Sequence, residues 1–162
     1  MIKSSTNMRK YSPKQYNKML PRKQIGTAVI LFNTKGELLI VKPNYKKGWL
    51  VPGGATENDE SPLQCAVRET EEEIGLRLFN LKLVGVYYGA KNGVFSDSLK
   101  LIFFGGVLTE NQVTGIILQA EELDQYAFVS VEKALTLLSS SLQKSLPACI
   151  EAIKNKTVAY IE

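Results

Sequence analysis

The chain has 162 residues, 44% of them hydrophobic and 22% charged, which suits one globular domain with a core of its own. It contains no histidine, which excludes His-based zinc sites, Ser–His or Cys–His nucleophile pairs and a histidine general base. No apolar run approaches the roughly 20 residues that cross a bilayer, so we expect no membrane partner.

Two features bear on compartment and domain organisation. Cys65 and Cys149 are too few for a disulfide framework, which favours a reducing, cytoplasmic location. Residues 1–23 carry seven Lys and Arg and no acid, whereas the remainder carries 13 basic and 16 acidic residues. We therefore predict a basic N-terminal arm over 1–23 and one folded domain over 24–162. The arm is either a solvated tail or a segment that attracts anionic ligands or nucleic acid.

The strands are predicted from apolar, β-branched segments. A buried strand at 25–33 is followed by a turn at 34–36 and a hairpin partner at 37–43. Further strands are expected at 81–90 and 98–108. The segment 115–130 is typical of a strand, an acidic loop and a short strand.

Helical spacing follows at 131–140 and 141–155, where Pro147 is expected to start or kink the second helix. Strands and helices do not alternate regularly, so the fold class predicted is α+β with a mixed sheet rather than a doubly wound one.

An acidic helix is the most informative element. Ser61 and Pro62 are a strong start signal, and Gly75 is a stop signal. One apolar stripe is expected to face the core, so that Leu63→Ala would cost about 2–5 kcal/mol. The residues of this stripe are Leu63, Ala66, Val67, Thr70 and Ile74.

The other side of this helix carries Arg68, Glu69, Glu72 and Glu73. Residues three and four apart are neighbours on a helix, so these carboxylates repel one another. Arg68 relieves only part of this charge. A run of glutamates is often just a solvated face, but an all-oxygen cluster also suits Mg²⁺ or Mn²⁺.

The spacing decides between these readings. Gly54, Glu60, Arg68-Glu69, Glu72-Glu73 and Gly75 are separated as in G-x5-E-x7-R-E-U-x-E-E-x-G-U, where U is a bulky aliphatic residue. This pattern resembles the Nudix box. All seven fixed residues match, which by chance at one place would occur about once in 10⁸. Thr70 at the first U position is the one departure, and it can still pack inward.

The resemblance implies a Nudix fold, a mixed β-sheet sandwiched between helices. It also implies hydrolysis of the diphosphate linkage in a nucleoside diphosphate linked to another group X, with Mg²⁺ or Mn²⁺ as cofactor. The substrate expected is a small nucleotide such as a nucleoside triphosphate or a nucleotide sugar. No sequence feature identifies X.

When the roles of the Nudix motif are assigned to the matching positions, the resemblance implies that Glu69, Glu72 and Glu73 are the metal-binding carboxylates. The carbonyl of Gly53 would be a further ligand. Arg68 is expected to orient them, while Glu60 and Gly54 support the cluster without binding the metal. Many family members use one more acid from a later loop.

That further acid is predicted to be Glu122, narrowly preferred to Glu121, because it lies six residues ahead of Phe128. A solvated acidic turn is the alternative for both residues. Glu69 and Glu122 are both open as the general base.

Substrate contacts are proposed for Trp49, Lys46 and Tyr88, although core packing is the competing role for both aromatic residues and a surface position for the lysine. Two other functions stay open: a Nudix-fold nucleotide-binding or regulatory module without turnover, and an RNA-directed Nudix enzyme that uses the basic arm. Nucleic acid is the less favoured partner. The oligomeric state is not predicted, and a homodimer is one option.

Overall fold

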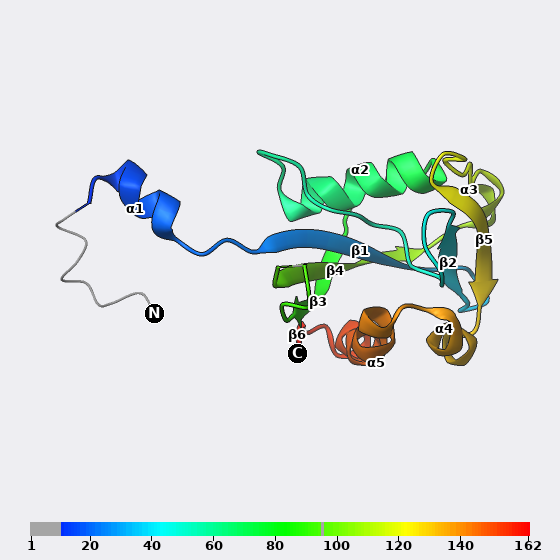
Figure 1. Ribbon diagram of the computed structural model, residues 1–162. Helices are drawn as coiled ribbons and strands as arrows, with labels where there is room; N and C mark the ends of the chain where they lie inside the picture. Colours follow the sequence, from blue (N-terminus) through cyan, green and yellow to red (C-terminus); the bar gives the residue numbers. More distant parts are fainter. Residues whose placement is uncertain (1–10, 95) are drawn as a thin grey trace.

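The computed structural model describes residues 11–94 and 96–162, and it contains one six-stranded mixed sheet between helices (Figure 1). The spatial order is β5-β2-β1-β4-β3-β6. β1 pairs with β4 and β3 with β6 in parallel, and the other neighbours are antiparallel. The strands are β1 (Gln24–Phe32), β2 (Leu38–Pro43), β3 (Lys82–Gly89), β4 (Ser98–Val107), β5 (Leu123–Val129) and β6 (Ala159–Ile161).

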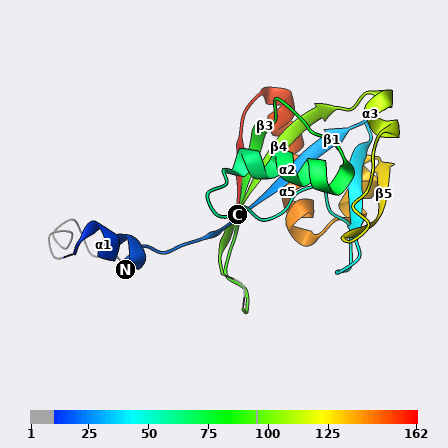
Figure 2. The same ribbon diagram turned by 90° about the horizontal axis from the view of Figure 1, so that it is seen from above.

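Helices cover both faces of this sheet. α2 (Pro62–Ile74) lies on one face, and α4 (Val131–Leu137) and α5 (Ser140–Asn155) lie on the other (Figure 1). Figure 2 looks down on α2, which lies over the strands. The α+β prediction, with a mixed sheet sandwiched between helices, is confirmed.

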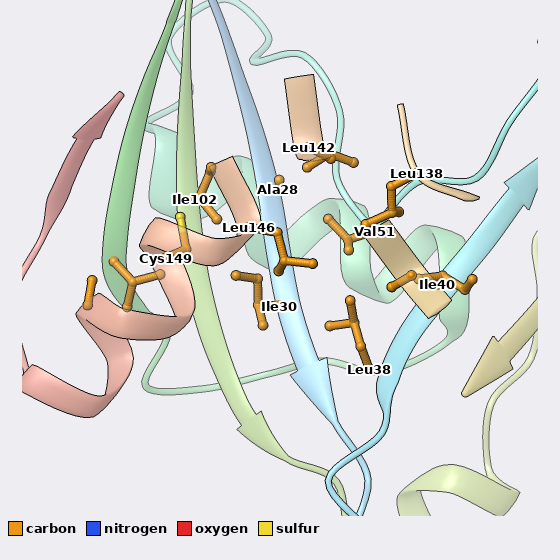
Figure 3. Close-up of a cluster of buried hydrophobic side chains, with 13 residues drawn as sticks. Ala28, Ile30, Leu38, Ile40, Val51, Ile102, Leu138, Leu142, Leu146 and Cys149 are labelled. Carbon is orange, nitrogen blue, oxygen red and sulfur yellow. The ribbon is translucent and has the colours of Figure 1, made fainter. Parts of the chain in front are cut away.

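The two faces build two hydrophobic cores, because successive side chains of a strand point to opposite sides. In β1, Ala28 and Ile30 face α5, whereas Val29 and Leu31 face α2. Figure 3 shows the first of these cores, in which residues of β1, β2 and β4 meet α5. The unbroken apolar run of β1 is thus explained by a strand that is buried on both faces.

The ends of α2 follow the sequence signals. Ser61 caps the first turn and Pro62 opens the helix, while Gly75 closes it in the left-handed conformation with φ 72°. The predicted buried stripe is wrong at one position, because Leu63 is 47% exposed.

The helix is rotated by about 50° from the orientation that its apolar stripe predicts, taking 100° per residue. Its buried residues are Cys65, Ala66, Thr70, Glu73 and Ile74. The rotation turns Glu73 inward at the expense of Leu63, which the apolar pattern could not reveal.

Three other elements differ from the expectations. The segment 115–118 forms no strand, and a short helix, α3 (Glu110–Thr114), precedes it. β6 was not expected, since only three residues form it. Pro147 lies inside α5, so of the two expected effects it does not start the helix, and a kink stays a prediction.

The basic arm contains a short helix, α1 (Pro13–Met19), that sequence reasoning did not predict. Ser12 and Gln15 form a capping box, and the helix buries none of its residues. The arm's Lys3, Arg9 and Lys10 lie outside the described residues. The domain boundary after residue 23 stays a prediction. Among the described residues, no helix is both long and apolar enough to span a membrane.

Candidate active site

A glycine turn joins β1 to the start of the acidic segment. The Thr27 amide donates to the Gly54 carbonyl at 2.7 Å, and the Val29 amide donates to the Pro52 carbonyl at 2.8 Å. Gly53 between them has φ 141°, and a Cβ there would lie 2.4 Å from the Thr27 carbonyl oxygen. Only glycine fits a backbone this close to the strand.

Glu73 points from α2 to this turn. Its Oε2 accepts a hydrogen bond from the Gly53 amide at 2.9 Å, and the residue is only 5% exposed. Burial, followed by the charges of Glu69 and Glu122, raises the pKa of Glu73 to about 7. The fold therefore holds a carboxylate whose negative charge is not balanced at neutral pH.

Glu69 lies one turn earlier and packs against Gly54. A Cβ on Gly54 would come within 2.3 Å of Glu69 Oε1, so the second glycine of the turn makes room for this carboxylate. Burial is the main cause that raises the pKa of Glu69, and the charges of Glu72 and Glu122 add to it.

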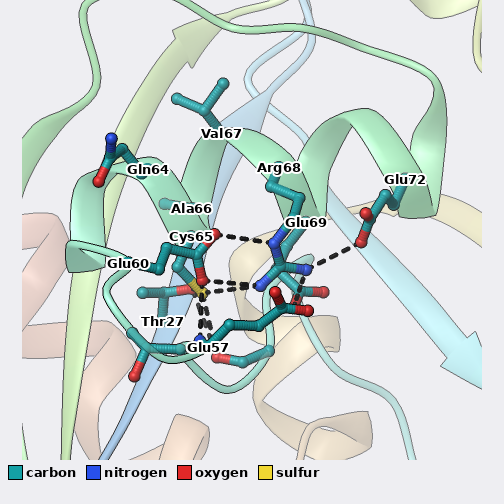
Figure 4. A network of polar contacts seen from close by, with 12 residues as sticks. Thr27, Glu57, Glu60, Gln64, Cys65, Ala66, Val67, Arg68, Glu69 and Glu72 are labelled. Carbon is teal, nitrogen blue, oxygen red and sulfur yellow. Dashed lines mark hydrogen bonds and ion pairs between the residues drawn. The ribbon is translucent and has the colours of Figure 1, made fainter.

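Arg68 holds the acids on the outer side of the cluster (Figure 4). Its guanidinium donates to both carboxylate oxygens of Glu60, at 2.8 and 2.9 Å, and to Glu69 and Glu72, each at 2.9 Å. The bonds from Arg68 lower the pKa of Glu60 to about 2. Glu60 is therefore ionised and fully engaged by Arg68, which suits a supporting role rather than ligation.

The later acidic loop also reaches the cluster. The Asn44 amide donates to the Glu122 carbonyl at 2.9 Å, which ties the loop to the segment before the glycine turn. The charge of Glu122 is among the causes that raise the pKa values of Glu69 and Glu73. Glu121 offers its backbone carbonyl to the Asn44 side chain. The backbone carbonyls of both residues thus bond to Asn44, and the choice of Glu122 over Glu121 stays a prediction.

Comparison with known proteins adds the family. A model of the NUDIX domain matches residues 22–149, which is most of the chain and includes the whole acidic segment. The chain belongs to the Nudix family. The expectation drawn from the spacing of its glutamates is thereby confirmed.

Relatives and solved structures agree with this assignment. An uncharacterised Nudix hydrolase of Pseudomonas aeruginosa is 30% identical over 135 residues, covering 80% of this chain and 73% of the relative. A putative 8-oxo-dGTP diphosphatase of Bacillus subtilis is 37% identical, but the match covers only 51% of this chain and about half of the relative, 52%.

The MutT protein of Methanosarcina mazei has a similar structure with a TM-score of 0.67, at 22% identity, covering 85% of this chain and 98% of the other. The likeness supports the Nudix fold. The membership supports the prediction of an enzyme that hydrolyses phosphoanhydrides.

The donor set of this Nudix site fits a hard divalent cation, because every candidate ligand is an oxygen. The carbonyls of Pro52 and Gly54 accept amides of β1, whereas no hydrogen bond within the described residues uses the Gly53 carbonyl. Over residues 11–94 and 96–162, no three acidic side chains are already gathered around one point. Arg68 bonds to one oxygen of Glu69 and one oxygen of Glu72, which leaves the second oxygen of each carboxylate available to a cation.

A cavity of about 340 Å³ adjoins the glycine turn. The starts of β1 and β4 and the turn itself form its walls, together with Tyr45, Lys46 and Leu142. Lys46 therefore lies at the cavity, and its contact with substrate stays a prediction.

The two aromatic residues proposed for substrate contact lie elsewhere. Trp49 is half-buried against the core on the α5 face, and its backbone bonds to Leu137 and Ser139. The Tyr88 hydroxyl donates to Asp97 at 3.2 Å, and Lys23 lies over the Tyr88 ring. Neither residue is among those that line the cavity.

Sequence reasoning missed two residues of this cavity, Tyr45 and Lys100. Tyr45 lies near the acids, since burial and the charges of Glu73, Glu122 and Glu69 raise its pKa. Lys100 interrupts an apolar strand, and that interruption was the one available signal.

Proposed function

We propose that this protein is a Mg²⁺- or Mn²⁺-dependent Nudix hydrolase that cleaves the diphosphate linkage of a small nucleotide, such as a nucleoside triphosphate or a nucleotide sugar. The observation that carries the proposal is the convergence of Glu69, Glu73 and the Gly53–Gly54 turn beside a cavity. The Bacillus subtilis relative, named a putative 8-oxo-dGTP diphosphatase, supports the nucleoside triphosphate class.

Glu69, Glu72 and Glu73, with the Gly53 carbonyl, would hold the cation. When bound, it would neutralise oxygens of the diphosphate and activate water for attack. The raised pKa values of Glu69 and Glu73 agree with this role, because burial and then the charges of neighbouring acids disfavour the ionised carboxylates, which a cation would stabilise.

The chain's own residues supply the rest of the reaction. Arg68 fixes Glu60, Glu69 and Glu72 through four hydrogen bonds, while the Gly53 amide fixes Glu73. Glu69 or Glu122 takes the proton from the attacking water. The water oxygen bonds to one phosphorus atom as the bridging P–O bond breaks, and the bridging oxygen leaves with the other phosphate.

The test is a substrate panel with purified protein. Nucleoside triphosphates, oxidised nucleoside triphosphates, ADP-ribose, dinucleoside polyphosphates and capped RNA are each incubated with Mg²⁺ or Mn²⁺. The products are separated by chromatography, because triphosphates release phosphate or pyrophosphate whereas ADP-ribose releases two phosphomonoesters. We expect turnover of at least one small nucleotide, its loss on chelation with EDTA and its recovery on adding the metal back.

The same panel separates the competing functions. Nucleotide binding without any cleavage product would identify a binding or regulatory module instead. Turnover confined to capped RNA would favour the RNA-directed reading, for which the exposed Lys14, Lys18 and Arg22 of the arm would then be the first residues to test.

A further inference from the structure

Lys100 occupies a position in β4 that should be apolar. It alternates with Ile102 and Phe104, whose side chains pack in the core on the α5 face. In the parallel register with β1, Lys100 lies beside Gly26, as Ile102 lies beside Ala28. The inward row of β4 therefore carries a charged residue directly before two apolar ones.

The Lys100 ammonium group has no acidic partner among the described residues. Within the described residues its one side-chain hydrogen bond is donated to the Ser141 hydroxyl at 3.4 Å, which is a long and neutral contact. Burial, and then the charge of Lys46, lowers the pKa of Lys100. A half-buried cation without a counterion destabilises the fold, so its retention points to a ligand.

The cavity supplies the place for that ligand. Lys46 and Lys100 are the charged residues that line it, and no carboxylate is among the lining residues of the described chain. Gly26 pairs with Lys100 of β4 on one side. On its other side it forms an isolated bridge with Ala55, which follows the glycine turn. Two strand spacings separate Lys100 from the turn, or about 10 Å.

The absence of a side chain at Gly26 keeps the floor of the cavity open between these two ends. A Cβ there would lie 3.2 Å from the Gly54 carbonyl oxygen, which is a tight contact. The acid cluster at one end is matched to cations, and the lysine end is matched to an anion.

We propose that Lys100, together with Lys46, binds a phosphoryl group of the substrate other than the diphosphate that is cleaved at the acid cluster. This inference rests on the proposed function and specifies its substrate class. The phosphoryl group has two sources: a further phosphate of a linear polyphosphate chain, or a phosphate carried on a sugar. A neutral carbonyl of a base would not balance the charge of two lysines.

The test compares Lys100→Met with the wild type on two pairs of substrates that differ by one phosphate. ATP and ADP differ in the polyphosphate chain, and NADPH and NADH differ in a ribose phosphate. Lys82→Met is the matched control, because Lys82 is an exposed lysine in β3. Met keeps the length of the side chain and removes its charge.

We expect Lys100→Met to lower kcat/KM by about 10- to 100-fold for the member with the extra phosphate, with a change below about twofold for its partner. The affected pair identifies the source of the phosphate. Lys82→Met should change neither member. Equal losses for both members of each pair, or no loss at all, would overturn the proposal.

A second measurement does not depend on turnover. Calorimetry with inorganic triphosphate, in the absence of divalent cations, should show binding to the wild type that weakens at least about tenfold in Lys100→Met. Unchanged binding would refute the role of Lys100 even if the enzyme proves active. Weakened binding in a protein that hydrolyses nothing would leave the anion site standing while the proposed hydrolysis fails. Thermal unfolding should show that Lys100→Met is as stable as the wild type or more so.

Discussion

Replacing Glu73 by Gln should stabilise the metal-free protein while abolishing its activity. The folded-state pKa of Glu73 is raised from 4.5 to about 7. A raised pKa means that the folded state binds the proton more tightly than the unfolded chain does. Stability from this group is therefore present below pH 4.5 and is lost as the pH rises toward 7.

The magnitude follows from the size of the shift. At 1.36 kcal/mol per pKa unit, ionising Glu73 costs the fold at most about 3 kcal/mol above pH 7. Gln carries no charge and can still accept the hydrogen bond of the Gly53 amide, which Glu73 accepts at 2.9 Å. The variant should thus recover about 1–3 kcal/mol at pH 8 and lose the pH dependence.

The assay is urea unfolding with EDTA present, at pH values from 4.5 to 8.5, for the wild type and Glu73→Gln. Glu71→Gln is the control, because Glu71 lies on the same helix, is exposed and pairs with Arg77 at 2.8 Å. We expect the control to follow the wild-type profile. Nucleotide hydrolysis with Mg²⁺ should vanish in Glu73→Gln alone.

Two results would refute this reasoning. One is a wild-type free energy of unfolding that stays flat between pH 5 and 8. The other is a Glu73→Gln variant that is no more stable than the wild type at pH 8. Either would mean that the burial of Glu73 does not perturb its ionisation, and the argument for a charge in need of a cation would lose its support.

Two further predictions concern packing around α2. Leu63→Ala should lower the free energy of unfolding in urea by less than about 1 kcal/mol, because Leu63 is 47% exposed. Ile74→Ala, at a buried position, should lower it by about 2–5 kcal/mol. Similar losses for the two variants would contradict the rotated orientation of α2. Gly53→Ala should destabilise by more than about 1 kcal/mol, since its Cβ would meet backbone, while Gly54→Ala should displace the Glu69 carboxylate and lower activity with a smaller loss of stability.

The sequence predicted those parts of the fold that depend on local signals. The cap at Ser61, the stop at Gly75 and the two-sided burial of β1 all follow from neighbouring residues. The face that α2 buries does not, because tertiary packing against the glycine turn outweighs the apolar stripe and places Glu73 inside. The pairing of β1 with β4 joins segments about 70 residues apart, which no local pattern reveals.

In the candidate site, too, residues fixed by local geometry could be predicted, whereas residues brought in by tertiary structure could not. The regular spacing of the box located Glu69, Glu72 and Glu73, whose positions on one helix depend only on helical geometry. Lys100 and Tyr45 reach the cavity through strand register and loop path, so single-sequence reasoning could not place them. The place of Trp49 before the glycine turn and the alternation of side chains at Tyr88 allow a substrate contact or a packing role, and the structure places both residues outside the cavity lining.

The segment 44–54 is held to neighbouring elements at several points, among them Asn44 to Glu122, Trp49 to the junction of α4 and α5, and Gly53 to Glu73. It acts as a strap that links α2 to the far side of the sheet. Lys46 lies on this strap between Asn44 and Trp49, so its position depends on the α4–α5 junction as well as on the glycine turn. A substitution at that junction is therefore expected to alter the lysine end of the cavity while the contacts of the acid cluster stay intact.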